Sequence, residues 1–209
     1  MKNRHWILGT LIFAALVVSA CSLAPVEPAG SAVDSVPVAE ESSGEALPPE
    51  QESQSAPQVT QPGWYAMELT DVNTGSVFRV ADLQGKVVLV ETMAVWCSNC
   101  FRQQLEVKEL HDLIGDREDF VGLGIDIDPN ESVPQLTGYV KENGFDWLYA
   151  VASTELINEI SDLYGPQFLN PPSTPMLIID KQGEANLLPF GIKSADELLE
   201  FLQPFLDES

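Results

Sequence analysis

The sequence predicts an α/β domain built on a mixed central sheet, because apolar runs typical of buried strands alternate with segments of helical spacing. Residues 86–90 (KVVLV) and 120–127 (FVGLGIDI) form two such runs, and residues 176–179 (MLII) form a third. Strands that are apolar along their whole length are typical of sheets covered on both faces. We therefore expect helices on both sides of this sheet.

The other elements follow the same alternation. Shorter strands are expected at residues 67–69, 77–80, 147–151 and 185–189. Helices are expected after Cys100, at residues 133–142, from Ser153 or Thr154 onward, and from a Ser194 cap to Phe205. In the third helix four apolar residues recur at helical spacing and are expected to face inward: Leu156, Ile157, Ile160 and Leu163.

Composition divides the chain near Trp64. Residues 22–60 contain six prolines, seven serines and seven acidic residues, without Lys, Arg or an aromatic residue. Such a segment cannot bury enough apolar surface to offset the entropy of ordering it. We interpret residues 21–60 as a disordered tether with a reach of roughly 35 Å. Residues 61–209 have the length of one domain.

The first twenty residues have the marks of an export signal: a basic start, an apolar stretch from Trp6 to Val18, and small residues at the end. Val18-Ser19-Ala20-Cys21 resembles the bacterial lipoprotein signal, which implies cleavage before Cys21 and lipid on that cysteine. An uncleaved anchor helix is the alternative. Both interpretations place the domain outside the cytoplasm, tethered to a bacterial membrane on its periplasmic or outer face.

Charge narrows the possible partners. The net charge is −22, and residues 61–209 alone hold 25 acidic and 8 basic residues. So negative a chain argues against binding nucleic acid and against direct contact with anionic lipid.

If Cys21 carries lipid, two cysteines remain available for chemistry: Cys97 and Cys100. A structural disulfide is one alternative in an exported protein, but closing so short a loop removes little chain entropy. A structural zinc ion is another, but it needs four ligands, and the sequence has no second Cys-x-x-Cys and only His111 beyond the signal. We therefore expect no metal or other cofactor, and a redox-active disulfide.

The position of Cys97-Ser98-Asn99-Cys100, between an apolar strand and a helix, suits that chemistry. Cys97 is expected at the helix N-terminus, where free N–H groups and the helix dipole favour a thiolate and lower the thiol pKa from about 8.5. Cys100 lies one turn further and can attack a mixed disulfide formed on Cys97. We expect Cys97 to attack and Cys100 to resolve.

Residues 83–100, LQGKVVLVETMAVWCSNC, resemble the active-site region of thioredoxin-fold proteins, especially the TlpA-like (redoxin) group that is tethered outside the cytoplasm. The resemblance covers most of residues 64–206, including a long βα insertion from Val121 to about Gly165. It implies a thioredoxin-like three-layer fold: a mixed central sheet flanked by helices, an N-terminal strand extension and that central insertion. It also implies thiol–disulfide exchange with exported proteins.

The same resemblance implies roles for three residues near the pair. Pro175 matches the cis-proline that faces the disulfide, and the backbone of Thr174 would pair with a substrate strand. An ordinary trans proline at the start of a strand is the alternative. Trp96 would form part of the docking surface.

Glu91 lies six residues before Cys97, where thioredoxins carry a buried acid that exchanges a proton with the second cysteine. The TlpA-like group commonly has Asn there, so this chain departs from that pattern. Burial would raise the pKa of the carboxyl group and suit it to proton transfer near neutrality. The alternative is a partly exposed Glu91 without a role, or one paired with Lys86 or Arg102.

The leading hypothesis is a monomeric, lipid-anchored thiol–disulfide oxidoreductase that takes electrons from a membrane donor and reduces exported proteins. The lack of a histidine between the cysteines and the acidic surroundings favour reduction over oxidation. By resemblance, clients are apocytochrome c, copper-site assembly proteins or misoxidised exported proteins. Two alternatives are a redoxin-type thiol peroxidase, although its Pro-x-x-x-Thr-x-x-Cys loop is missing around Cys97, and a non-catalytic binding module with a structural disulfide.

Overall fold

Strand β3 (Val87–Met93) is the central strand of a five-stranded sheet. It pairs in parallel with β4 (Phe120–Asp126), which pairs in parallel with β5 (Leu148–Val151). On its other side β3 pairs antiparallel with β6 (Met176–Ile179), and β6 pairs antiparallel with β7 (Ala185–Leu187). The order is β5–β4–β3–β6–β7, and the sheet is mixed, as predicted.

The structure is a computed structural model that describes residues 61–208. The predicted export signal at 1–20, the lipidation of Cys21 and the tether at 21–60 lie outside the described residues. Within the described part, no helix is long and apolar enough to cross a membrane.

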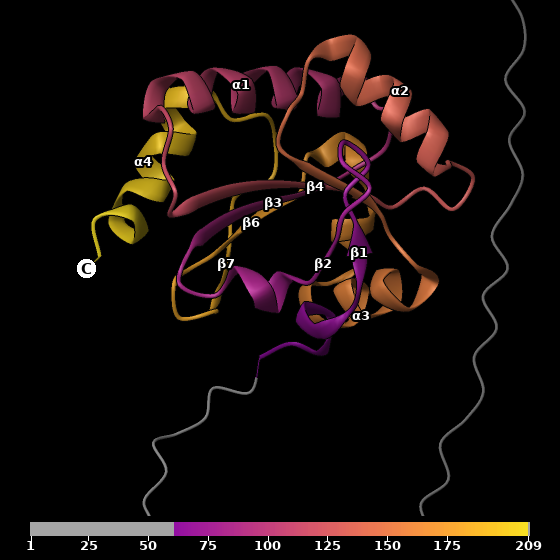
Figure 1. Ribbon diagram of the computed structural model, residues 1–209, viewed down its shortest axis with the longest axis horizontal. Helices are drawn as coiled ribbons and strands as arrows, with labels where there is room; N and C mark the ends of the chain where they lie inside the picture. Colours follow the sequence, from indigo (N-terminus) through magenta and orange to yellow (C-terminus); the bar gives the residue numbers. More distant parts are fainter. Residues whose placement is uncertain (1–60, 209) are drawn as a thin grey trace, which may run out of the picture. The chain divides into compact units, whose positions relative to one another are not determined.

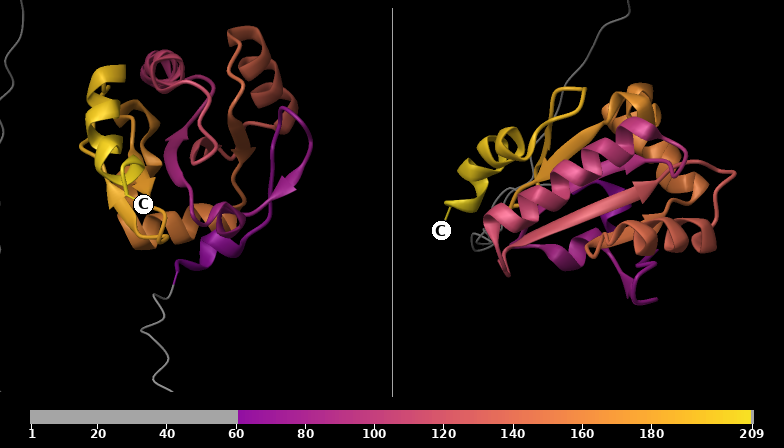
Figure 2. Two further views of the ribbon diagram at one scale, coloured as in Figure 1. Left: turned by 60° about the vertical axis from the view of Figure 1, so that its left-hand side comes forward. Right: turned by 90° about the horizontal axis from the view of Figure 1, so that it is seen from above.

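Helices cover both faces of the sheet, which confirms the three-layer arrangement (Figure 1). One face packs against α1 (Ser98–Ile114), α2 (Val133–Asn143) and α4 (Ala195–Leu206). The other packs against α3 (Thr154–Tyr164) and the 3-10 turn η1 (Gly63–Ala66). Helix α1 also packs against α4, and the view from above shows the two helices on the same side of the sheet (Figure 2).

Both faces of β3 are buried, so alternate side chains of this strand enter different cores. Leu89 and Met93 pack in the core that contains the two cysteines. Val88 and Val90 pack in the core beneath α3. Glu91 lies between Leu89 and Met93 in this alternation, so its side chain enters the cysteine-bearing side of the molecule.

Two sequence expectations are wrong in detail. The N-terminal strand pair is β1 (Leu69–Thr70) and β2 (Val77–Phe78), and the second strand does not reach Val80. The chain instead turns into a 3-10 segment, because the side chain of Asp82 accepts a hydrogen bond from the Arg79 N–H. Leu163 is 49% exposed, because the inner stripe of α3 runs along Leu156 and Ile160.

Candidate active site

The two predicted cysteines meet at the N-terminus of α1, where they form a disulfide. Cys97 is the N-cap residue: its backbone is extended, and its sulfur accepts a hydrogen bond from the Cys100 N–H at 3.1 Å. The free N–H groups of the first turn and the helix dipole point toward this sulfur. Once the bond is reduced, this position favours the thiolate form of Cys97.

Both cysteines are buried in the oxidised protein: Cys97 is 2% exposed and Cys100 is fully buried. The Cys100 sulfur lies 3.2 Å from the carbonyl oxygen of Pro171, and the side chain of Asn99 donates to the carbonyl of Pro172 at 2.8 Å. The loop before β6 therefore contacts the first turn of α1 at Asn99 and Cys100.

Two carboxylates of the loop between β4 and α2 hold the residues that precede Cys97. Glu131 Oε2 accepts from the Val95 N–H at 2.7 Å. Asp128 Oδ2 accepts from the indole N–H of Trp96 at 2.6 Å, while the Trp96 side chain remains 59% exposed. The segment that presents Cys97 is thus fixed by negatively charged groups. Sequence reasoning missed both contacts, because they join loops that are far apart in the chain.

Asp126 lies behind these two carboxylates, at the end of β4, and is fully buried. Its Oδ1 accepts from the Asp128 N–H at 3.0 Å, and its Oδ2 has no partner among the described residues. Burial raises the pKa of Asp126 to about 7, and Glu131 adds to the rise. The cluster therefore holds a proton near neutrality, close to the segment that presents Cys97.

Glu91 is buried, at 4% exposure, which removes the alternative of an exposed side chain. Burial raises its pKa well above the usual value, and the Lys193 ammonium and the Gln104 amide act in the opposite direction. The charged group acting on Glu91 is thus Lys193, and not Lys86 or Arg102. A cavity of about 10 Å³ beside Glu91 has about the volume that one water molecule needs.

The loop before β6 holds Thr174 in a left-handed conformation, with φ of 45°. Thr174 is fully buried; its N–H donates to the Pro171 carbonyl at 2.8 Å, and its own carbonyl accepts from Lys193 Nζ at 3.3 Å. The carbonyl of Pro175 accepts from the Thr92 N–H at 3.2 Å. The backbone N–H and carbonyl of Thr174 both have partners within the protein. For the predicted pairing with a substrate strand, bonds to the substrate would have to replace these internal bonds.

Sequence reasoning also missed Lys193 and Gln103, which are both buried. The Lys193 N–H donates to Gln103 Oε1 at 2.7 Å, and Gln103 Nε2 donates to the Lys193 carbonyl at 3.0 Å. The sequence offers one weak signal for Lys193: a cation directly before the helix cap Ser194, in an acidic stretch.

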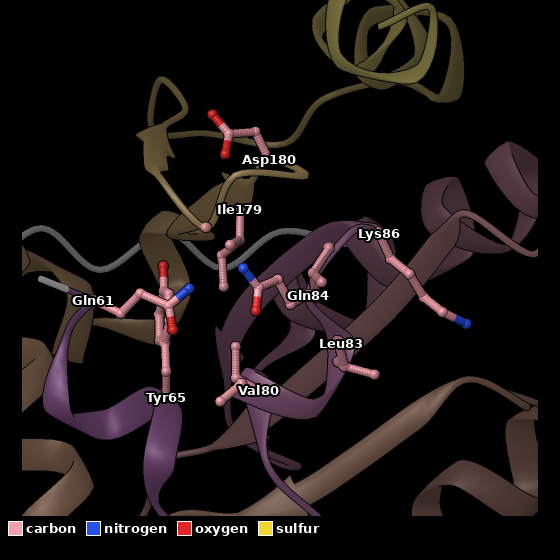
Figure 3. A pocket seen from close by; sticks show the side chains of 11 residues that line it. Gln61, Tyr65, Val80, Leu83, Gln84, Lys86, Ile179 and Asp180 are labelled. Atoms are coloured by element: carbon pink, nitrogen blue, oxygen red, sulfur yellow. The ribbon is translucent and has the colours of Figure 1, made fainter. Parts of the chain in front are cut away.

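The described residues contain no group of three or more side chains that could hold a metal ion. The small pocket in Figure 3 lies between Tyr65, Val80 and Ile179, at the opposite end of β3 from the disulfide, and has a volume of about 10 Å³.

Comparison with known proteins agrees with this fold. No family model and no curated protein matches the sequence. Among solved structures, a protein from Aquifex aeolicus assigned to electron transfer has a TM-score of 0.58 and 18% identity, covering 69% of this chain and 94% of its own. The thioredoxin domain of a thiol-disulfide oxidoreductase from Bacteroides vulgatus has a TM-score of 0.51 and 15% identity, covering 71% and 99%.

A thiol:disulfide interchange protein of the thioredoxin family from Chlorobium tepidum has a TM-score of 0.50 and 22% identity, covering 67% of this chain and 92% of its own. Each of these proteins resembles this chain in the arrangement of the sheet and helices. The chain has the thioredoxin-like fold.

Proposed function

We propose that this protein is a thiol–disulfide oxidoreductase whose reactive pair is Cys97 and Cys100. The observation that carries the proposal is the disulfide at the start of α1, with Cys97 as the N-cap and Cys100 buried behind it. A thiolate needs the N-terminal position, and a resolving thiol needs to be close but shielded from the partner.

The proposed reaction runs in two steps. The Cys97 thiolate attacks one sulfur of a partner disulfide, forming a mixed disulfide and releasing the other partner sulfur as a thiolate. The Cys100 thiol then gives up its proton, and its sulfur attacks Cys97. The Cys97–Cys100 bond forms, the second partner sulfur leaves with the electron pair, and the partner is reduced by two electrons while the protein is oxidised.

Glu91 is the proposed acceptor of the Cys100 proton. It is buried on the same side of the sheet as the two cysteines, and burial raises its pKa, which makes its carboxylate a stronger proton acceptor. The cavity beside it has about the size of one water molecule, which can carry the proton where direct contact is missing.

Reduction of the partner is the proposed direction. The carboxylates of Asp128 and Glu131 contact the residues before Cys97, and negative charge nearby disfavours a thiolate. A pair whose thiolate is not strongly stabilised has a lower reduction potential and gives up electrons more readily. We expect a potential closer to about −270 mV than to about −120 mV, measured by equilibration with glutathione.

The proposed setting is outside the cytoplasm, with the domain anchored through lipid on Cys21 and held by the tether at 21–60. The composition of the first sixty residues supports this setting. Exported proteins would be the partners, and a membrane reductase would restore the thiols.

A trapping experiment tests the proposed function. Without the resolving thiol, Cys100→Ala should accumulate a mixed disulfide between Cys97 and its partner, visible as a larger species on non-reducing gels. The matched control is the double variant Cys97→Ala, Cys100→Ala, which should trap nothing. A single variant that traps no partner in cells and does not react with a disulfide-bonded peptide in vitro would refute the proposal.

A further inference from the structure

Gln103 is a fully buried polar side chain that the reaction above does not use. It lies on α1, one turn after Cys100. Its amide group forms a reciprocal pair with the backbone of Lys193: Gln103 Oε1 accepts from the Lys193 N–H at 2.7 Å, and Gln103 Nε2 donates to the Lys193 carbonyl at 3.0 Å. Such a pair ties two segments together, because polar groups left unpaired in the interior are costly.

Lys193 connects this pair to the loop before β6. Its Nζ donates to the Thr174 carbonyl at 3.3 Å and to the Gly191 carbonyl at 2.6 Å. The Gly191 N–H donates to the Ser173 carbonyl at 2.9 Å. Two hydrogen bonds thus join residues 191–193, which we call the brace, to residues 173–174. One donor is the ammonium group of a lysine that is 5% exposed, and its carbonyl partners replace part of its lost hydration.

The loop that the brace contacts contains a strained residue. Thr174 has a φ of 45°, and among the described residues it is the one residue other than glycine with a positive φ. A β-branched residue adopts this conformation at a cost and keeps it only where its surroundings fix it. The Thr174 N–H is bonded to the Pro171 carbonyl and the Thr174 carbonyl to Lys193. The brace therefore supplies one of the two backbone contacts that fix the strained residue.

The same loop contacts the first turn of α1 at the cysteine pair. The Pro171 carbonyl lies 3.2 Å from the Cys100 sulfur, and the Pro172 carbonyl accepts from the Asn99 side chain at 2.8 Å. The contacts form a closed path: they leave α1 at Gln103, pass through the brace and the loop, and return to α1 at Cys100.

We propose that Gln103 is a positioning residue for disulfide exchange, which fixes the brace and through it holds the loop before β6 against Cys100. This inference rests on the proposed function and adds one residue to it. Gln103 does not touch the reacting sulfurs, and the balance of atoms and electrons in the exchange is unchanged. A fixed loop restricts the Cys100 sulfur to a position close to Cys97, and restricting two reacting groups in this way raises their effective concentration.

Equilibration of the full chain with reduced and oxidised glutathione measures this effective concentration. Gln103→Met has a side chain of similar length that cannot form either bond. We expect it to lower the equilibrium constant for forming the Cys97–Cys100 disulfide by about 10-fold, which raises the reduction potential by about 30 mV.

Leu156→Ala is the matched control, because Leu156 is buried in the core on the other face of the sheet and its truncation destabilises the fold without touching the path. Its equilibrium constant should equal that of the native protein. A merely structural Gln103 would lower stability and leave the constant unchanged, so a Gln103→Met constant equal to the native one would overturn the inference. An equal shift in Leu156→Ala would overturn it as well.

Lys193→Met tests whether these contacts act along one path. It removes the Nζ bonds to Thr174 and Gly191 and keeps the backbone groups that Gln103 binds. The double variant Gln103→Met, Lys193→Met should therefore shift the constant by no more than the larger single shift, whereas additive shifts would contradict the proposed path. A native protein that does not equilibrate with glutathione would refute the proposed function instead, so the two failures are distinguishable.

A measurement on the native protein covers the case in which the variants do not fold. Amide hydrogen exchange of the Thr174, Gly191 and Lys193 N–H groups should give one common free energy of opening, because linked contacts open as a unit. Separate free energies of opening for the Lys193 and Thr174 N–H groups would overturn the inference.

Discussion

Asp126→Asn tests the electrostatic arrangement behind Cys97, because Asp126 is the fully buried member of that acidic cluster. The substitution keeps the shape of the side chain and an oxygen that can accept from the Asp128 N–H, which lies 3.0 Å away. It removes only the ionisable proton. Any pH-dependent difference in stability between Asp126→Asn and the native protein therefore reports the ionisation of Asp126.

The size of the effect follows from the pKa of Asp126, which rises from 3.8 to about 7. One pKa unit corresponds to about 1.4 kcal/mol, so ionising Asp126 in the folded protein costs about 4 kcal/mol. The pKa of Asp126 is higher in the folded protein than in the unfolded protein. The protonated carboxyl group therefore contributes its full stabilisation below about pH 4, and this contribution is lost as the pH rises through 7. The negative charge of Glu131 contributes to this rise, and we expect Asp126→Asn to gain about 2 to 4 kcal/mol at pH 8.

Urea denaturation of the oxidised protein, followed by tryptophan fluorescence at pH 4, 6 and 8, measures this difference. The gain of Asp126→Asn over the native protein should be near zero at pH 4 and largest at pH 8. Asp128→Asn is the matched control, because hydrogen bonds from Asn130 and Trp96 lower the pKa of Asp128, so its replacement should bring no gain at pH 8. Equal stability of Asp126→Asn and the native protein at all three values would refute the reasoning.

Three further changes have defined outcomes. Glu91→Gln should slow the release of the mixed disulfide at pH 7 by about 10-fold or more, since general acid–base catalysis contributes at least that much; an unchanged rate in stopped flow would remove Glu91 from the mechanism. Gly124→Ala should destabilise the fold by about 1 to 3 kcal/mol in urea, because its Cβ would lie 2.4 Å from the ring of Tyr149. Gly138→Ala is its control, with nothing within 4 Å, and a similar loss there would contradict the steric explanation. Cys21→Ala should move the protein from the membrane to the soluble fraction of cells; unchanged fractionation would argue against lipid on Cys21.

The order of elements could be predicted because local patterns specify it. Unbroken apolar runs identified β3, β4 and β6 within a few residues, and the Ser194 cap marked the start of α4. The sequence-based expectations were wrong where one local pattern is compatible with two structures. Leu163 continues a helical apolar spacing, yet α3 has a narrower buried stripe than the spacing suggested.

For the candidate site, the sequence by itself identified the proposed reactive pair, since one Cys-x-x-Cys between a strand and a helix places both sulfurs at a helix start. It also marked Glu91 as a carboxyl group in an apolar strand. It could not determine the neighbours of these groups, because contacts such as Trp96 with Asp128 and Lys193 with Thr174 join segments far apart in the chain.

The tertiary structure decided which charges act on the site. Whether Glu91 is paired, and with which cation, depends on the side chains that folding brings to the same face of the sheet. The pKa of a buried group depends on its lost hydration and on charges a few ångströms away, which follow from packing rather than from sequence distance. The sequence therefore determined which atoms can react, and the fold determined the electrostatic environment in which they do so.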